Sequence, residues 1–203
     1  MKMPYESTGR SRQKARTRDA LLTAARTLLG EGQTPTVEQT ADAAGISRTT
    51  AYRYFPNQRT LLLAAAPVID RPSLLPPDPP ADAASRLDVV IAGQIEILRT
   101  WEPQLRAALR LSLDEDAAAP PEDRPVLRRG RAIAWIQEAL EPLASSHPRI
   151  DRRRLAIAIR AGCGIESWVW MVDVAAISRA EAAAIMRQSA KALLAAAVGA
   201  PDR

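Results

Sequence analysis

Side chains that could contact a nucleic acid are grouped in one short segment of the chain. Arg48 can donate two parallel hydrogen bonds to a guanine, and Thr49 or Thr50 can touch a thymine methyl group. The hydroxyls of Tyr52 and Tyr54 can donate to phosphate oxygens. These side chains would suit DNA recognition if one helix carried them into the major groove, where the N-terminal residues of such a helix meet the bases.

The residues before this group specify a helix, a tight turn and a second helix. Thr36 and Gln39 form a T-x-x-Q capping box, in which each side chain bonds the backbone N–H of the other residue. Gly45 supplies the left-handed conformation that ends a helix, and Ser47 offers an N-cap oxygen to the next helix. Residues 36–54 are therefore predicted to form a helix-turn-helix. An ordinary helical hairpin with a solvated polar face is the alternative.

Two further helices would support this pair. Apolar residues recur at helical spacing from about Arg12 to Leu29, and Asn57 can cap a linker helix that reaches about Ala66. Residues 1–10 show no such periodicity, and their positive charge continues to Arg18, so a flexible basic arm is predicted there. Such an arm can lie along a phosphate backbone or enter a minor groove, although most are simply solvated.

The segment from Thr36 to Leu62, with the helix before it, resembles the DNA-binding region of the TetR family of bacterial transcriptional repressors. The resemblance is strongest in the run G-I-S-R-x-T-x-Y-x-Y-F-P-N-x-R-x-L, which starts at Gly45. The resemblance implies a three-helix DNA-binding domain, a larger helical domain for ligand binding and dimerisation, and release from the operator when an effector binds. Where the family often has Lys, this chain has Gln58, so the phosphate contact there falls to Gln58 or to Arg59. The residues implied to contact DNA are Thr36, Arg48, Thr49, Thr50, Tyr52, Tyr54, Asn57 and Arg59.

The distribution of charge agrees with a DNA-binding head. The chain of 203 residues has a formal net charge of +5, from 28 basic and 23 acidic residues. Residues 1–63 hold ten Lys and Arg against five Asp and Glu, which leaves eighteen of each kind for residues 64–203. The excess is therefore N-terminal, as expected for a basic head on a neutral body. A disordered basic tail unrelated to nucleic acid is the alternative.

Composition predicts an all-α fold, because the 47% apolar content leans on Ala and Leu and includes one Phe. The expected order is a flexible basic arm at 1–10, the DNA-binding domain with its linker helix at 11–66, a Pro-rich linker at 67–81, and a C-terminal helical effector-binding and dimerisation domain at 82–203. Leu74 and Leu75 favour a packed wrap for the Pro-rich segment, since adjacent leucines seldom stay in water. Apolar spacing then predicts helices around 87–98, 105–112 and 126–140, with a surface loop at 114–125.

The last two predicted helices indicate an oligomer. Asp151 can cap a helix that runs to about Val174, and a second capping box at Ser178 and Glu181 opens a helix that runs to about Val198. Both are apolar on more than one face, so a second subunit is expected to cover the second face. Propensity alone would also allow strands at 155–159 and 168–174, and the family resemblance favours helices there.

Enzymatic chemistry has few candidate groups in this sequence. Cys163 and His147 are the only residues of their types, and a buried structural thiol is the better interpretation of the cysteine, with a hydrolase using this pair as the alternative. Metal-ligand spacing and a phosphate-binding glycine loop are missing from the sequence, so neither an enzyme nor a metal or cofactor protein is expected. One cysteine, no signal-peptide pattern and no recognised run of 18 apolar residues favour a cytoplasmic protein without a membrane partner.

An effector site is the least specified feature of the sequence. Pockets combine apolar walls with a few polar anchors, and Trp135 together with Glu166 or Arg110 could provide both. The alternative is that the tryptophans are ordinary core residues and the arginines ordinary surface residues. The candidate ligand-binding residues are Trp101, Arg110, Trp135, Glu166 and Trp170.

Together these features predict a homodimeric regulator, expected to be a repressor, that binds a pseudo-palindromic operator and is released by an unknown small molecule. The rival interpretation is a helical small-molecule-binding or scaffold dimer whose DNA-binding head has degenerated. Gln58 is the one feature that favours the rival.

Overall fold

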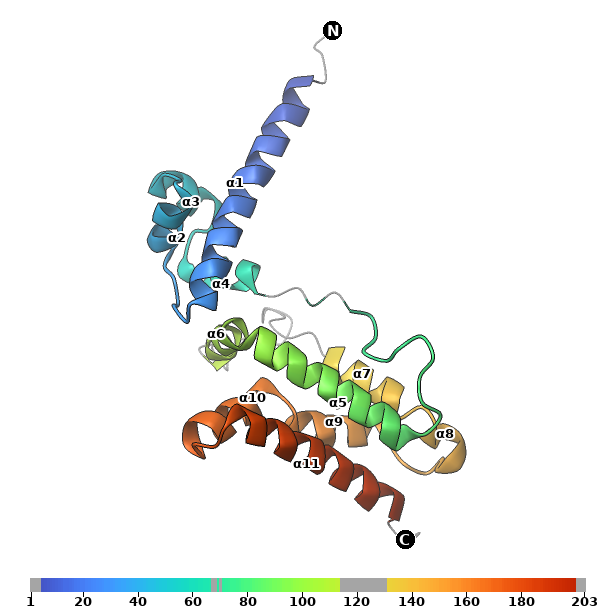
Figure 1. Ribbon diagram of the computed structural model, residues 1–203. Coiled ribbons are helices and arrows are strands. Elements are labelled where there is room, and N and C mark those ends of the chain that lie inside the picture. Colours follow the sequence, from blue (N-terminus) through green and yellow to red (C-terminus); the bar gives the residue numbers. More distant parts are fainter. Residues whose placement is uncertain (1–4, 67–68, 70, 114–130, 200–203) are drawn as a thin grey trace. The chain divides into compact units, whose positions relative to one another are not determined.

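The computed structural model describes residues 5–66, 69, 71–113 and 131–199, and all regular structure within these ranges is helical (Figure 1). The predicted all-α fold is confirmed, and the alternative of strands at 155–159 and 168–174 is wrong. The chain divides into two compact units. The first comprises Met1–Val68 with Pro103–Leu127, and the second comprises Ile69–Glu102 with Arg128–Arg203.

The first unit contains α1 (Tyr5–Gly30), α2 (Val37–Ala44), α3 (Arg48–Tyr54), α4 (Gln58–Ala65) and α6 (Glu102–Leu113). Its core takes residues from every one of these helices, and the sequence signals for the helix ends of α2 to α4 are found in place. Burying these side chains supplies most of the stability of such a small unit, at about 25 cal/mol per Å² of apolar surface. The largest buried members are Leu21, Leu22, Leu29, Val37, Phe55, Leu61 and Leu62.

The first helix corrects one prediction. Residues 1–10 were expected to be a flexible arm and the helix to start near Arg12, whereas α1 begins at Tyr5. Residues 5–18 contain no proline and several good helix formers (Glu, Gln, Arg and Lys), so helix propensity carries the helix beyond the part that packs. The predicted arm is helical from Tyr5 onward, and residues 1–4 lie outside the described ranges.

The unit to which α6 belongs differs from the predicted domain division. The helix lies within the range 82–203 that was expected to form one C-terminal domain, yet most of it belongs to the first unit. Ala107 is buried in the core of that unit, and Leu111 packs against it. Pro103 stands at the second position of the helix, where a missing backbone N–H costs nothing. The predicted loop at 114–125 and the first part of the helix predicted at 126–140 lie outside the described residues.

The second unit is a helical bundle. It comprises α5 (Ala83–Thr100), α7 (Arg131–Ala139), α8 (Leu143–Ser146), α9 (Arg152–Gly162), α10 (Ile165–Val169), the π-helix η2 (Trp170–Val174) and α11 (Arg179–Gly199). Contacts join α5 to α7, α7 to α9, α9 to α11 and α11 back to α5, so four helices enclose one core. The largest fully buried side chains there are Leu87, Ile91, Ile136, Leu140, Ile159, Ile165, Trp168 and Met186.

The Pro-rich segment packs against this bundle, as its leucines predicted. The indole nitrogen of Trp135 donates to the backbone carbonyls of Arg71 (3.1 Å) and Pro72 (3.2 Å). The Ser73 hydroxyl donates to the Glu138 carboxylate at 2.8 Å. Leu74 lies against Gly93, where a Cβ atom would come within 3.4 Å of the leucine side chain. The Trp135 indole thus satisfies two backbone carbonyls of a segment that forms no regular structure, and the Ser73–Glu138 bond adds a contact between side chains.

The single helix predicted from 151 to 174 is wrong, because the chain breaks at Cys163. Asp151 caps α9 as predicted, but α9 ends at Gly162 and α10 starts at Ile165. The ion pair between Arg160 and Glu166 (3.2 Å) closes over Gly164, where a side chain would collide with both groups. The bundle thus bends its helix at a place where the sequence offers only small residues.

The segment Arg152–Val174 is, by length and composition alone, apolar enough to cross a membrane, which the sequence analysis did not anticipate. Its mean hydropathy reaches 1.3, and 39% of that window is buried inside the protein. The segment starts with three consecutive arginines, is broken at Cys163 and contributes Ile159 and Trp168 to the core. These are the features of a bundle helix, and length with hydropathy is weak evidence for a span.

Candidate nucleic-acid interface

The third helix is held rigidly by its two ends. Gly45 ends α2 with φ +65°, and the Ser47 hydroxyl accepts from the backbone N–H of Thr50 at 3.3 Å. Ala51 and Phe55 are almost fully buried and fix one face of α3 in the core. Thr36 and Gln39 form the predicted capping box at the start of α2. The helix-turn-helix therefore follows from local signals, and its opposite face is left to solvent.

That opposite face carries the predicted base-reading residues. Arg48, Thr49 and Tyr52 are exposed, with 60% of the Arg48 side chain and 43% of Tyr52 accessible. Thr50 is half-buried, and its hydroxyl oxygen accepts a hydrogen bond from Ser47. Tyr54 is half-buried and packs its ring against the core. Arg48, Thr49 and Tyr52 are thus accessible on α3, whereas Thr50 is partly covered and Tyr54 serves partly as an anchor.

Two acidic side chains on the neighbouring helix meet Arg48, and the sequence analysis missed them. The guanidinium lies 3.3 Å from the Asp42 carboxylate and 3.8 Å from that of Glu38. Glu38 and Asp42 stand four residues apart, so they share one face of α2, and this spacing next to an arginine was the available signal. These carboxylates hold the guanidinium in the free protein, and they would repel a phosphate placed beside it.

The remaining predicted DNA contacts flank the helix-turn-helix. Thr36 and Asn57 are exposed, and both hold helix ends, since the Asn57 side chain accepts from the Thr60 N–H at 2.8 Å. Arg59 is half-buried and donates to the backbone carbonyl of Leu111 at 3.3 Å. Gln58 donates to two backbone carbonyls of the loop before α2, those of Thr34 and Pro35, both at 3.1 Å. Arg59 and Gln58 thus serve the packing of this unit.

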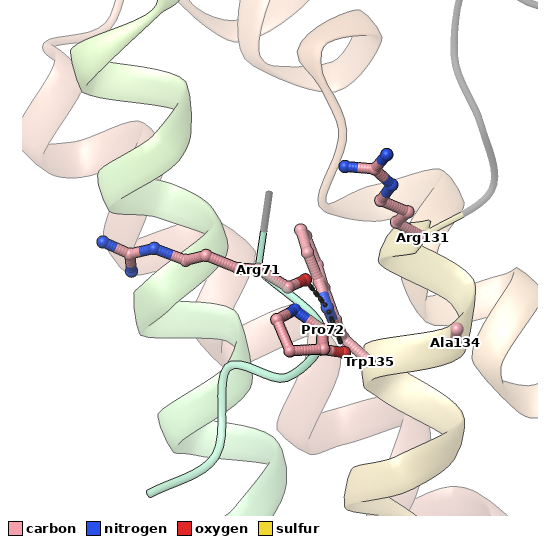
Figure 2. Close-up of a pocket in the computed structure, with 5 residues that line it drawn as sticks. All are labelled: Arg71, Pro72, Arg131, Ala134 and Trp135. Atoms are coloured by element: carbon pink, nitrogen blue, oxygen red, sulfur yellow. Dashed lines mark hydrogen bonds between the residues drawn. The ribbon is translucent and has the colours of Figure 1, made fainter. Parts of the chain in front are cut away.

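The five candidate ligand-binding residues do not come together. Trp135 lines a cavity of about 250 Å³ with Arg71, Pro72, Arg131 and Ala134, and Figure 2 shows the Arg71 side chain extending away from the indole ring. Glu166 and Trp170 line a different, more open groove of about 420 Å³ with residues of α11. Trp101 is half-buried and lines neither hollow. Arg110 belongs to the first unit, where it donates to the Thr34 hydroxyl at 3.3 Å.

The lone cysteine is a core residue in the structure. Cys163 is 3% exposed, and its thiol donates to the backbone carbonyl of Met186 at 3.5 Å. Burial raises the pKa of this thiol to about 11, so it is a neutral thiol at physiological pH and a poor nucleophile. His147 is half-buried, with its Nδ1 atom 3.0 Å from the hydroxyl of Ser146. Its bonding partner is thus a neighbouring serine.

Comparison with known proteins agrees with this geometry. Residues 21–65 match the model of the family described as bacterial regulatory proteins, tetR family. These residues include the part of α1 that packs, both helices of the helix-turn-helix and all of α4. The match covers the helix-turn-helix head, which is therefore a DNA-binding domain of the TetR type at the N-terminal end of the chain.

The whole fold is similar to that of one solved structure, SmeT in a complex with triclosan. The two share 19% sequence identity with a TM-score of 0.50, over 92% of this chain and 99% of the other. At this identity the likeness concerns the fold, in which a helical body follows a helix-turn-helix head. No curated protein matches the chain.

Proposed function

We propose that this protein is a homodimeric repressor that binds a pseudo-palindromic operator and leaves it when a small molecule binds the second unit. The observation that carries the proposal is the exposed face of α3, on which Arg48, Thr49 and Tyr52 project from a helix anchored by Ala51 and Phe55. Two such helices related by a two-fold axis would reach half-sites about one helical turn, roughly 34 Å, apart. Thr36, Tyr54 and Asn57 would approach phosphates at the rim.

The proposed dimer interface lies on the last helices. Trp170 (59% exposed) and Val174 (69%) project from η2, and Ile185, Leu193 and Val198 are exposed along α11. Soluble monomers seldom leave several large apolar side chains on adjoining elements in water, which supports a second copy as their cover. Glu166 and Trp170 then belong to this region.

The proposed effector site is the cavity beside Trp135. It combines an aromatic wall with the cationic side chains Arg71 and Arg131 at its edge, a lining that suits a small aromatic or anionic molecule. A small-molecule ligand is present in the solved SmeT complex. Binding would alter the separation of the two heads, with a coupling of roughly 1 to 3 kcal/mol. A cytoplasmic location follows from this role.

The rival interpretation, a scaffold with a degenerate head, loses its one supporting feature. Gln58 was the departure that favoured it, and Gln58 holds the carbonyls of Thr34 and Pro35 in the loop that leads into α2. A residue that orders the helix-turn-helix does not indicate that the head has lost its role.

The test is to select bound fragments from the source genome and then compare Arg48→Ala with Arg53→Ala on the recovered site. Arg48→Ala should relax the preference at one base pair by about 1 to 3 kcal/mol. Arg53 is exposed near the other end of α3. Arg53→Ala therefore removes the same charge and should leave the preference at that base pair unchanged. If the wild type recovers no common sequence, the proposal of specific recognition fails. If Arg48→Ala weakens every sequence equally, Arg48 contacts phosphate instead.

A further inference from the structure

We infer that the N-terminal half of α1 is a second DNA-binding element, in which Arg12, Lys14 and Arg16 bind phosphates of the duplex that α3 reads. This inference rests on the DNA-binding function proposed above. It assigns a partner to a surface that the helix-turn-helix does not use. The elements concerned all belong to the first unit.

The described residues of α1 that precede Leu21 contribute no buried side chain to the core of that unit. The buried residues of α1 begin at Leu21 and continue through Leu22, Ala25 and Leu29. From Ser11 to Ala20 no residue is buried, and nine of these ten residues are exposed. Figure 1 shows the helix continuing well past α2 and α3. About three turns of helix, from Ser11 to Ala20, are therefore folded without a core beneath them.

The charges make this free helix unfavourable by itself. Positive charge in the first turns of a helix opposes the helix dipole. Arg12 and Arg16 stand four residues apart, as do Lys14 and Arg18, so each pair of like charges repels along one face. Asp19 is the one acidic residue from Ser11 to Ala20. A helix that is polar all round depends on partners outside itself, and here the fitting partner is a polyanion.

The position of the helix selects DNA as that polyanion. The guanidinium of Arg18 lies 5.7 Å from the centroid of the Phe55 ring, and Phe55 is the residue that ends α3. The basic stretch thus starts beside the end of the recognition helix and continues away from it within the same unit. A duplex that receives α3 in its major groove presents phosphates on both sides of that groove. The same duplex can therefore supply the phosphates that Arg12, Lys14 and Arg16 would contact.

The test compares the full-length double variant Arg12→Gln/Arg16→Gln with the wild type on a random-sequence duplex across salt concentrations. Each phosphate contact contributes about 0.9 to the slope of log K against log salt, so the variant should lose up to about 1.8. The matched control is Arg153→Gln/Arg154→Gln, which removes two exposed arginines from α9 in the second unit and should keep the wild-type slope. Arg12→Lys/Arg16→Lys should restore the slope, since a phosphate accepts either cation.

Several results would overturn the inference. Parallel lines for the wild type and Arg12→Gln/Arg16→Gln would show that this half of α1 is solvated on DNA. An equal loss in the α9 control would show a general effect of net charge. If the wild type itself binds no duplex at any salt, the proposed function fails first, and this outcome is distinct from parallel lines. Circular dichroism with thermal melting shows whether each variant is folded, and the single variants Arg12→Gln and Arg16→Gln, each expected to lose up to about 0.9 of the slope, provide a second test if the double variant is not.

Discussion

At the scale of single residues, the central feature is the arginine that we propose to read a base. In the free protein, Arg48 lies between the carboxylates of Asp42 and Glu38. An exposed ion pair of this kind is worth about 0 to 1 kcal/mol. DNA phosphates and base edges can therefore displace the carboxylates at little cost, and the pair moderates affinity without blocking recognition.

Replacing Asp42 with Asn should tighten binding to random DNA. The change removes a competitor for Arg48 and a charge that repels phosphates, so we expect a gain of about two- to fivefold, equivalent to at most about 1 kcal/mol. Fluorescence anisotropy at fixed salt measures it, with Glu31→Gln as the control because Glu31 is an exposed acid of the same unit outside both α3 and the basic half of α1. Weaker binding by Asp42→Asn would instead mean that the carboxylate holds Arg48 in its productive orientation.

At the scale of elements, the helix ends were predictable and the tertiary contacts were not. Thr36, Gly45, Ser47 and Asn57 each act on atoms within a few residues, so the sequence is enough to place them. The pairing of Arg48 with α2 depends on the angle between two helices. Likewise, the membership of α6 in the first unit depends on Ala107 reaching a core assembled from distant residues.

The effect of one such helix end on stability can be measured at Gly45. This glycine adopts φ +65° at the end of α2, and a Cβ there meets no neighbouring atom, so the penalty of Gly45→Ala is conformational. We expect the first unit to lose about 1 to 2 kcal/mol of unfolding free energy, measured by urea denaturation. Gly30→Ala is the control, since Gly30 lies at the end of α1 without a positive φ and its Cβ would make only an ordinary contact. Equal losses in both variants would contradict this explanation.

The contact between α5 and α11 includes an ion pair whose carboxyl can titrate. Arg187 and Lys191 both pair with Asp88, and the hydrogen bonds from Arg187 lower the pKa of that carboxyl below its usual 3.8. A carboxyl with a lowered folded-state pKa stabilises the fold above its unfolded pKa, and this stabilisation is lost as the pH falls through the folded value.

Asp88→Asn should therefore cost about 1 kcal/mol of unfolding free energy at neutral pH. The difference from the wild type should shrink as the pH falls below about 3.8, the ordinary value for this group. Urea denaturation at several pH values measures both effects. Glu96→Gln is the control, because Glu96 is exposed on the same helix. A difference that stays constant with pH would show that the variant disturbs packing and that charge is not the cause.

At the scale of the whole molecule, the sequence predicted an all-α regulator with a basic head and a neutral body, because composition and charge are sums over many residues. It did not predict the bend at Cys163. The sequence there contains glycines and apolar residues that a straight buried helix would also tolerate, and the bend is set by the closure of the Arg160–Glu166 pair over Gly164. The bend also starts the segment that presents Trp170 and Val174 to solvent.

Trp170→Glu should convert the proposed dimer into a monomer. The side chain is 59% exposed, so the substitution leaves the core intact, whereas in a dimer it would place a charge in an apolar interface opposite its own symmetry-related copy. Size-exclusion chromatography with light scattering gives the mass, and the control is Leu113→Glu, which makes a similar change at a 75% exposed position in α6. Because two heads must bind together, the monomer should also lose most of its operator affinity, while one head keeps its weak binding to random DNA. A Trp170→Glu protein that remains dimeric would place the interface elsewhere, and the exposed apolar side chains of η2 would then need another partner.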